Sequence, residues 1–471
     1  MKLKKYKLYE IADLNTSSIS NSDNTLSEII YLDTSSITEN VILSTYKVSI
    51  HEAPSRAQRR VKKNTILYST VRPRLKHYGI LSSPEANLIV STGFVTIDVK
   101  SEFQDSVDAR FLFLLLTQPH ITEYIASIAD SAVSAYPSFN PSDISALEFE
   151  FPEMNIQTHI ADIWEYYDSK IGLNRQINDN LEAMAKQLYD YWFVQFDFPN
   201  EEGKPYKSSG GAMVYNERLK REIPVDWQVV HLIDFAEIKN GATPSTADDS
   251  NYGGDIVWIT PKDLSDQQSK FVYQGERNIT KQGFDSCSTS MIPINSVLMS
   301  SRAPIGLVSI AKHEVCTNQG FKSFIPKNME DSIYLYYYIK HHIKQIEQLG
   351  TGTTFKEVSM DDLCKFPILA VGAKEAYKQW IELQNGIADK QLILTKEIEA
   401  LTKQRDELLP LLMNGQASIN YHLSARNYPL PIAHKKANTY CYKPNNKQYF
   451  HPKVRQPYTS PRLRTSQIRC S

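Results

Sequence analysis

Three basic residues in one short loop, Arg72, Arg74 and Lys76, are the first side chains in the chain with an evident chemistry. They belong to the sequence Arg-Pro-Arg-Leu-Lys-His-Tyr, which follows an apolar stretch that predicts a strand at residues 65–68. Guanidinium groups donate paired hydrogen bonds to phosphate oxygens and to the O6 and N7 atoms of guanine. The loop therefore predicts contacts with nucleic acid, although a solvated basic surface would give the same pattern.

A second group of candidates lies in the other half of the chain and combines cations with small polar residues. One loop reads Ser-Ser-Arg-Ala-Pro-Ile-Gly at residues 300–306, and another reads Lys-Asn-Gly-Ala-Thr-Pro-Ser at residues 239–245. Backbone N–H groups and hydroxyls in such loops can contact phosphates. Taken alone, either loop is equally well explained as a plain turn. The candidates here are Arg302, Lys239, Thr243, Ser245 and Lys262.

Motifs of catalysis and cofactor binding are missing from the sequence. It contains no phosphate-binding loop, dinucleotide fingerprint, zinc-binding His-Glu-x-x-His helix or nucleophile elbow. The adjacent His341 and His342 would point about 100° apart on a helix, which makes a poor shared metal site. The pairs at residues 248–249 and 361–362 are aspartates that fit a turn and a helix N-cap. We therefore predict no catalytic residue, no metal site and no cofactor bound by this chain.

Two long helical patterns, at residues 153–196 and 373–415, must position these loops. Apolar residues recur every seven positions with a second series four residues later, which is typical of a coiled coil. Each helix of roughly 40 residues would measure about 60 Å at a rise of 1.5 Å per residue. A single helix lying on a globular body is the alternative. The residues expected to hold the two helices together are Trp164, Ile171, Leu181, Trp380, Ile387, Leu394 and Leu401.

The sequence before each long helix is repeated. The segment Ile-Tyr-Leu-Asp-Thr at residues 30–34 corresponds to Val-Trp-Ile-Thr-Pro at 257–261, and Gly-Phe-Val-Thr-Ile at 93–97 corresponds to Gly-Phe-Lys-Ser-Phe at 320–324. Matches in the same order at a nearly constant offset predict duplicated mixed α/β globules at residues 1–152 and 223–372. Helices are expected at 109–129 and 332–348, and a turn-rich linker at 197–222. The order is globule, helix, globule, helix.

Composition limits the class of protein. The chain has 471 residues, a formal net charge of −1, 41% hydrophobic residues and five cysteines without disulfide or metal spacing. We therefore expect a cytoplasmic protein that does not enter a membrane. The overall charge gives no support for nucleic-acid binding, so that role depends on local patches. Residues 420–471 are basic with no Asp or Glu, and we expect them to be disordered.

The arrangement resembles the specificity subunit of Type I restriction–modification systems over residues 1 to about 419. The segments that most resemble the family are Ile-Pro-x-Asp-Trp at 223–227, Gly-x-Thr-Pro-Ser at 241–245, the loop at 300–306, and Leu-Leu-Pro-Leu-Leu-Met-Asn-Gly-Gln at 408–416. The first globule departs from the pattern, with Asn-Thr-Ser-Ser at 15–18 and Thr-Val-Arg-Pro at 70–73 in the matching loops. The segment 420–471 is not part of the family pattern.

The resemblance implies an α+β fold with two target-recognition domains separated by two long antiparallel coiled-coil helices. Each domain would read one half of a split site in double-stranded DNA, and the helices would act as a ruler. Modification (methyltransferase) subunits and a restriction (motor–nuclease) subunit would be the partners and would hold S-adenosylmethionine, ATP and Mg²⁺. This chain would direct adenine methylation and restriction without catalysing either. A protein-interaction scaffold is the alternative, and the salt dependence of DNA affinity distinguishes the two.

Overall fold

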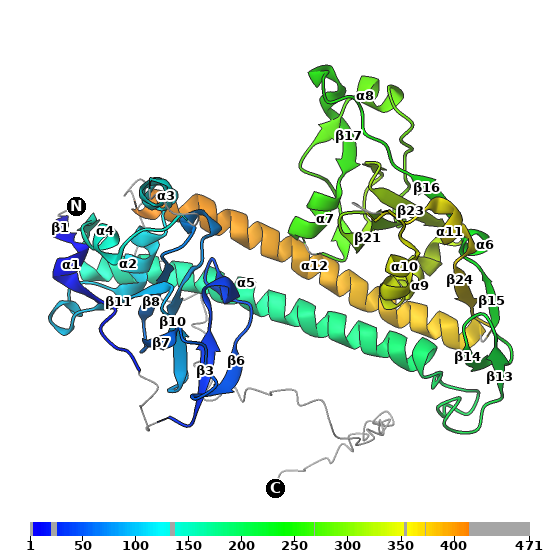
Figure 1. The fold of residues 1–471 in the computed structure, drawn as a ribbon, viewed down its shortest axis with the longest axis horizontal. Coiled ribbons are helices and arrows are strands. Elements are labelled where there is room, and N and C mark those ends of the chain that lie inside the picture. Colours follow the sequence, from blue (N-terminus) through cyan, green and yellow to red (C-terminus); the bar gives the residue numbers. More distant parts are fainter. Residues whose placement is uncertain are drawn as a thin grey trace, which may run out of the picture. The chain divides into compact units, whose positions relative to one another are not determined.

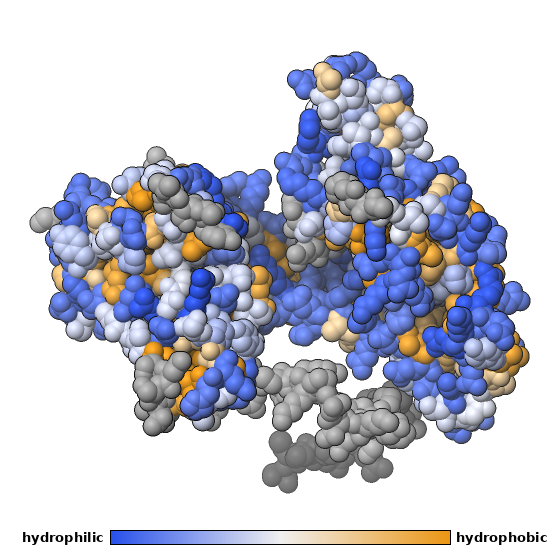
Figure 2. All heavy atoms as spheres, viewed as in Figure 1, coloured by the Kyte–Doolittle hydropathy of each residue, from blue (hydrophilic) through white to orange (hydrophobic). Residues whose placement is uncertain are grey.

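The computed structural model describes residues 3–19, 26–131, 137–267, 269–352, 356–372 and 374–413, which form two globules and two long helices (Figure 1). The predicted disordered segment 420–471 lies outside the described residues. In the part of the chain that is described, no helix is both long and apolar enough to cross a membrane. On the face shown in Figure 2, hydrophilic residues cover much of the surface and hydrophobic areas are interspersed among them.

The two long helices, α5 (Met154–Tyr189) and α12 (Lys374–Met413), pack side by side in opposite directions (Figure 1). Lys170 forms an ion pair with Glu397 at 2.7 Å, and Gln384 donates a hydrogen bond to the main-chain oxygen of Ala185 at 2.8 Å. Residue numbers therefore rise along one helix as they fall along the other. With 36 and 40 residues, the helices are about 54 and 60 Å long.

The seam between the helices is apolar with polar interruptions. Six of the seven predicted packing residues are buried, namely Trp164, Ile171, Trp380, Ile387, Leu394 and Leu401, and Leu181 is partly buried. Asn174, Gln384 and Gln391 are buried in the same pair. Because a buried amide must find a partner at one register, these residues fix the alignment of the helices at some cost in packing.

Each globule contains two main sheets. One sheet has the strand order β2-β11-β8-β9 in the first globule and β16-β23-β20-β21-β18 in the second, and its strand pairs are antiparallel except that β18 runs parallel to β21. The other sheet has the orders β6-β3-β10-β7 and β19-β17-β22, in which β3 pairs in parallel with β10 and β17 pairs in parallel with β22. A two-stranded pair, β1 with β12 or β15 with β24, precedes each long helix. The duplication expected from the sequence thus extends to strand order and direction.

The strands of the first globule are β1 (Lys4–Lys7), β2 (Ala12–Leu14), β3 (Glu28–Leu32), β4 (Ile37–Thr38), β5 (Val41–Ile42), β6 (Tyr46–Ser49), β7 (Ala57–Arg60), β8 (Thr65–Ser69), β9 (Tyr78–Leu81), β10 (Leu88–Ser91), β11 (Phe94–Val99) and β12 (Glu148–Phe151). Those of the second are β15 (Gln228–His231), β16 (Ala236–Asn240), β17 (Tyr252–Ile259), β18 (Phe271–Val272), β19 (Asn278–Ile279), β20 (Val297–Ser301), β21 (Ile305–Ala311), β22 (Cys316–Thr317), β23 (Phe321–Pro326) and β24 (Pro367–Ala370).

Both helices predicted inside the globules are broken, which corrects the sequence interpretation. The first divides into α2 (Ala109–Leu116) and α3 (Pro119–Asp130) because Pro119 lacks an N–H and forces Gln118 out of the helical region. The second divides into α9 (Ser332–His341) and α10 (Ile343–Leu349) at His342, whose ring stacks on Tyr338 with centroids 4.1 Å apart. The remaining globule helices are α1 (Leu8–Ile11), α4 (Pro141–Ser145), α6 (Leu232–Phe235), α7 (Pro261–Gln267), α8 (Lys281–Asp285) and α11 (Met360–Lys365).

Each globule is anchored to the helices by side chains. In the first, Arg110 forms ion pairs with Asp162 and Glu165 of α5, both at 2.7 Å. In the second, Tyr334 and Trp380 pack around Phe193, with ring centroids 4.9 and 4.8 Å from it. These contacts attach the globules to the helix pair.

The segment 197–222, expected as a turn-rich linker, contains ordered structure. The strands β13 (Met213–Asn216) and β14 (Arg221–Pro224) form an antiparallel pair. Phe198 is buried and stacks on Trp227, with ring centroids 5.2 Å apart. The segment is therefore packed against the start of the second globule.

Candidate nucleic-acid interface

Three loops of the second globule and the first turn of α7 meet around Gly320. A Cβ atom added at Gly320 would lie 3.2 Å from Pro261 and 3.6 Å from Nε of Arg302. Thr243 donates a hydrogen bond to the side chain of Gln319, and Nε1 of Trp258 donates to the main-chain oxygen of Ala242 at 3.2 Å. The segments that carry three of the predicted residues, Arg302 and Thr243 in loops and Lys262 in α7, therefore lie together although they are far apart in sequence.

The backbone around Arg302 is braced on both sides. The hydroxyl of Ser300 donates to the main-chain oxygen of Pro304 at 2.7 Å and accepts from the N–H of Leu307 at 2.9 Å. The N–H of Val358 donates to the main-chain oxygen of Ser301 at 3.0 Å, and residues 302 and 357 form an antiparallel bridge. The loop is thus held by strand-like pairing with a segment more than fifty residues later in the chain.

Arg302 belongs to a group of three charged side chains, which we call the 302–322–357 triad. The guanidinium of Arg302 lies 3.8 Å from one carboxylate oxygen of Glu357, and the ammonium of Lys322 lies 3.2 Å from the other. The Arg302 side chain is 35% exposed, whereas that of Lys322 is only 8% exposed. A partly accessible guanidinium therefore lies beside a carboxylate that forms a shorter ion pair with a buried cation.

The other predicted residues of this globule have partners of their own. Lys262 forms an ion pair with Glu276 at 2.8 Å, both side chains being 66% exposed, and Lys239 of β16 pairs with Glu237 at 2.5 Å. The main-chain oxygen of Ser245 accepts from Asn251 at 3.0 Å. Exposed ion pairs contribute little stability, so these lysines can exchange their carboxylates for phosphates at small cost.

In the first globule, the predicted cations Arg74 and Lys76 are paired with carboxylates. Arg74 lies 2.5 Å from Asp130 and 3.2 Å from Glu123, both on α3, and Lys76 lies 2.5 Å from Glu39. The main-chain N–H of Arg72 donates to the oxygen of Pro137 at 2.8 Å. The sequence predicted neither the carboxylates of α3 nor Glu39 as partners, because they are distant from the loop in sequence.

The equivalent loops of the two globules match residue by residue through their backbone bonds. Residues 71 and 138 form the same antiparallel bridge as 302 and 357, and the N–H of Phe139 donates to the oxygen of Thr70 at 3.1 Å. Arg72 and Ala303 both have positive φ, 48° and 45°, and both precede a proline. Arg302 therefore corresponds to Val71, and Arg72 is not its counterpart.

Sequence reasoning missed two residues of the triad, Lys322 and Glu357. Lys322 occupies a buried position of β23, and Val95 occupies the corresponding position of β11, because Lys322 pairs with Met299 as Val95 pairs with Tyr68. A lysine in an otherwise apolar strand was the available signal. Glu357 had no signal in the sequence, since only the fold brings it to the loop.

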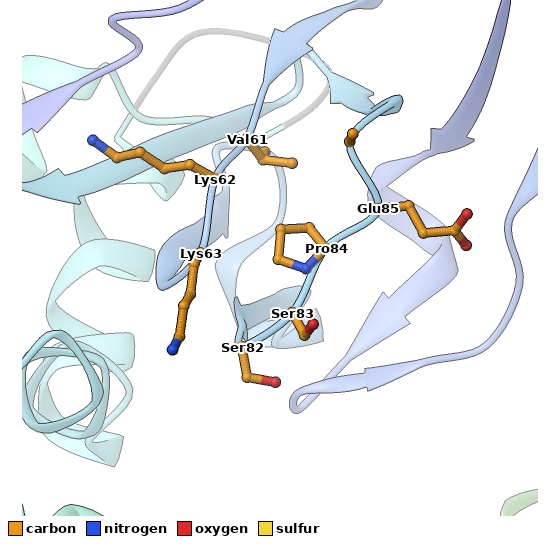
Figure 3. Close-up of a pocket in the computed structure, with 8 residues that line it drawn as sticks. Val61, Lys62, Lys63, Ser82, Ser83, Pro84 and Glu85 are labelled. Carbon is orange, nitrogen blue, oxygen red and sulfur yellow. The ribbon is translucent and has the colours of Figure 1, made fainter. Parts of the chain in front are cut away.

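A shallow pocket of about 370 Å³ in the first globule is lined by two lysines and two serines, Lys62, Lys63, Ser82 and Ser83 (Figure 3). Figure 3 shows the two lysine side chains leaving the loop in different directions, and Lys62 lies 3.9 Å from Asp98. The cations therefore do not converge on one anion. Within the described residues, no group of three or more His, Cys, Asp or Glu side chains is arranged to hold a metal ion.

Comparison with known proteins identifies the family. The family model described as "Type I restriction modification DNA specificity domain" matches residues 2–183 and 224–410, which covers each globule with most of its long helix. The chain belongs to this family. The resemblance stated from the sequence is confirmed, as is the α+β fold with duplicated domains and long helices. The family is one of DNA-recognition subunits, and its members are not the catalytic ones.

Individual relatives extend over different shares of the chain. The HindI specificity subunit of Haemophilus influenzae is 27% identical in an alignment 464 residues long, and the match covers 87% of this chain and 99% of the relative. The MjaIX specificity subunit of Methanocaldococcus jannaschii is 41% identical over 159 residues, 33% of this chain and 37% of that subunit. The crystal structure of a Type I restriction–modification S subunit from M. genitalium has the same fold, with a TM-score of 0.55, 14% identity and coverage of 89% and 97%.

Proposed function

We propose that this chain reads a bipartite site in double-stranded DNA and thereby directs adenine methylation and restriction that partner subunits carry out. The observation that carries the proposal is the repeated globule, with equivalent loops at residues 69–73 and 300–304, each copy being anchored to an antiparallel helix pair. Two copies of one recognition fold on a stiff spacer suit two half-sites separated by a fixed distance. The relatives are specificity subunits of Type I restriction enzymes, which supports this function.

The DNA contacts are proposed for the loops described above. Arg302, Thr243 and Lys262 would serve the second half-site with Lys239 and Ser245, and Arg72, Arg74 and Lys76 would serve the first. Most of these cations are paired with carboxylates in the free chain. On binding, these cations would exchange their carboxylate partners for phosphates or base edges. Non-specific DNA would then gain little binding free energy, and DNA with the matching site would gain more.

The helix pair offers equivalent apolar positions for modification subunits. Leu173 of α5 is 56% exposed and Ile393 of α12 is 60% exposed. The two positions correspond in the duplicated sequence, and both side chains point away from the seam. We propose that these two equivalent positions contribute to the contacts with the modification subunits. Two copies of a methyltransferase subunit, followed by a motor–nuclease subunit, are the partners we propose.

The direct test is methylation sequencing of DNA from cells that express this chain together with a Type I modification subunit encoded beside it. We expect a motif of two short blocks around a fixed unspecific gap, in which adenines are methylated only when this chain is present. Cells that lack the chain but retain the modification subunit are the control. A motif that persists without the chain would contradict the proposal.

A second prediction concerns the affinity of the assembled methyltransferase for a duplex that carries its site. We expect the affinity to fall linearly with salt concentration on a double logarithmic scale, because each neutralised phosphate releases counterions. With six or more phosphate contacts, the loss between 50 and 200 mM salt is about 1,000-fold or greater. Fluorescence anisotropy measures this slope. A salt-independent affinity would favour a scaffold that binds proteins.

A further inference from the structure

The 302–322–357 triad is a feature of the second globule that its duplicated partner lacks. In the first globule, the backbone bridge and the hydrogen bond to the preceding residue are the same, but Val71, Ser138 and Val95 stand in place of the three charged residues. The fold of this loop therefore forms without any of the three charges. Their presence calls for an explanation other than folding.

Lys322 is the charge that folding alone explains least, because its position in β23 is buried. Burying an ammonium group is unfavourable unless an anion compensates it, and the equivalent Val95 fills the same strand position with no charge. The compensating anion is Glu357, and the second oxygen of this carboxylate is directed at Arg302. The backbone of residue 357 pairs with that of residue 302, which keeps the Glu357 side chain, 40% exposed, next to the loop.

We propose that Glu357, held by Lys322, is a positioning residue that orients Arg302 to read one guanine in the half-site of the second globule. This inference rests on the proposed function. One carboxylate oxygen lies 3.8 Å from a terminal nitrogen of the guanidinium, a charge contact longer than a hydrogen bond, which leaves the N–H donors of the planar group for the O6 and N7 atoms of a guanine. A guanidinium fixed by a carboxylate loses less freedom on binding than one that moves in solvent.

Gly320 lies beside the guanidinium. A Cβ atom at this residue would lie 3.6 Å from Nε of Arg302, which is an ordinary contact, and 3.1 and 3.2 Å from the side chains of Asn318 and Pro261. The chain around Gly320 therefore adjoins the Arg302 side chain, and Glu357 is its charged neighbour.

The test compares the methylated motif of Glu357→Gln with that of the unaltered chain, each assembled with its modification subunits. Glutamine keeps the shape of the side chain and removes its charge. We expect the preference for guanine at one position of one half-site to fall about ten-fold, with the other half-site unchanged. Arg302→Ala should relax the same position. The matched control is Glu222→Gln, which removes the same charge from an exposed ion pair with Lys207.

Two outcomes would overturn the inference. One is a Glu357→Gln motif identical to that of the unaltered chain. The other is an even loss of methylation at every position of both half-sites, because a positioning role acts at one base. Should Glu357→Gln fail to fold, Arg302→Lys provides the test: it keeps the charge on a partly exposed side chain but removes the planar group, and unchanged guanine preference would refute the inference. If the unaltered chain directs no motif, the proposed function itself has failed.

Discussion

Replacing both Ile387 and Leu394 by aspartate is expected to separate α12 from α5 and to unfold the part of the chain that depends on their seam. The two side chains are 8% and 4% exposed, so each substitution removes a packed aliphatic group and buries a carboxylate without a partner. Loss of the aliphatic groups alone costs about 2–5 kcal/mol per site, and the uncompensated charges add to this. Thermal unfolding of the purified chain, followed by circular dichroism at 222 nm, measures the effect.

The same helix provides a matched control for this prediction. Leu383 and Ile393 are 50% and 60% exposed, so aspartate at these two positions changes charge and helix propensity equally without disturbing the seam. We expect the control to melt within a few degrees of the unaltered chain. Equal melting temperatures for the seam variant and the control would contradict the packing of the two helices.

The helix seam was the part of the fold that the sequence predicted best. Residues such as Trp380 and Ile387 recur every seven positions, which keeps one face of a helix against a partner helix. Leu181 fits the period but is only partly buried, and it packs against the core cluster that includes Trp380. The duplication was equally visible, since two copies of one fold constrain the same positions twice.

The charged contacts of the candidate interface were much harder to predict from the sequence. The spacing of Arg74 and Lys76 identified a basic loop, but their carboxylate partners on α3 and at Glu39 depend on tertiary contacts. The correspondence of Arg302 with Val71 follows from the equal spacing of residues 64–73 and 295–304, but the partners of Arg302 in the triad, Glu357 and Lys322, depend on tertiary contacts. Ion pairs between distant segments leave no periodic trace in a sequence, whereas helix faces do.

Removing the carboxylate of Glu182 is the second substitution expected to have a large effect. Glu182 of α5 lies 2.6 Å from the ammonium of Lys270, whose side chain is 5% exposed and which also donates to Gln391 of α12 at 2.8 Å and to Tyr337 of α9. This polar clamp joins the second globule to both long helices. Glu182→Ala leaves a buried ammonium without its carboxylate, which costs about 3 kcal/mol.

The control for this substitution is Glu397→Ala, which breaks an ion pair with Lys170 between the same two helices. The side chains of Glu397 and Lys170 are 37% and 40% exposed, so the loss is expected to stay below about 1 kcal/mol. Chemical denaturation of the three chains at pH 7 compares the losses. Replacing Lys270 by methionine together with Glu182→Gln removes both charges and is expected to recover much of the stability. Equal midpoints for Glu182→Ala and Glu397→Ala would show that the clamp contributes no more than a surface pair.

The pH dependence of the difference between Glu182→Ala and the unaltered chain gives an independent check. Burial opposes ionisation of Glu182, but the ammonium of Lys270 outweighs it and holds the pKa of this carboxyl below its usual value of 4.5. A lowered pKa in the folded chain stabilises the fold above about pH 4.5, and this contribution disappears as the pH falls through the folded value. Burial also lowers the pKa of Lys270, so that raising the pH through its folded pKa discharges the ammonium and removes the need for a carboxylate. The stability difference is therefore expected to be widest between these two titrations and to shrink on either side. A difference that stays constant from acid to alkaline pH would mean that Glu182 acts through packing alone.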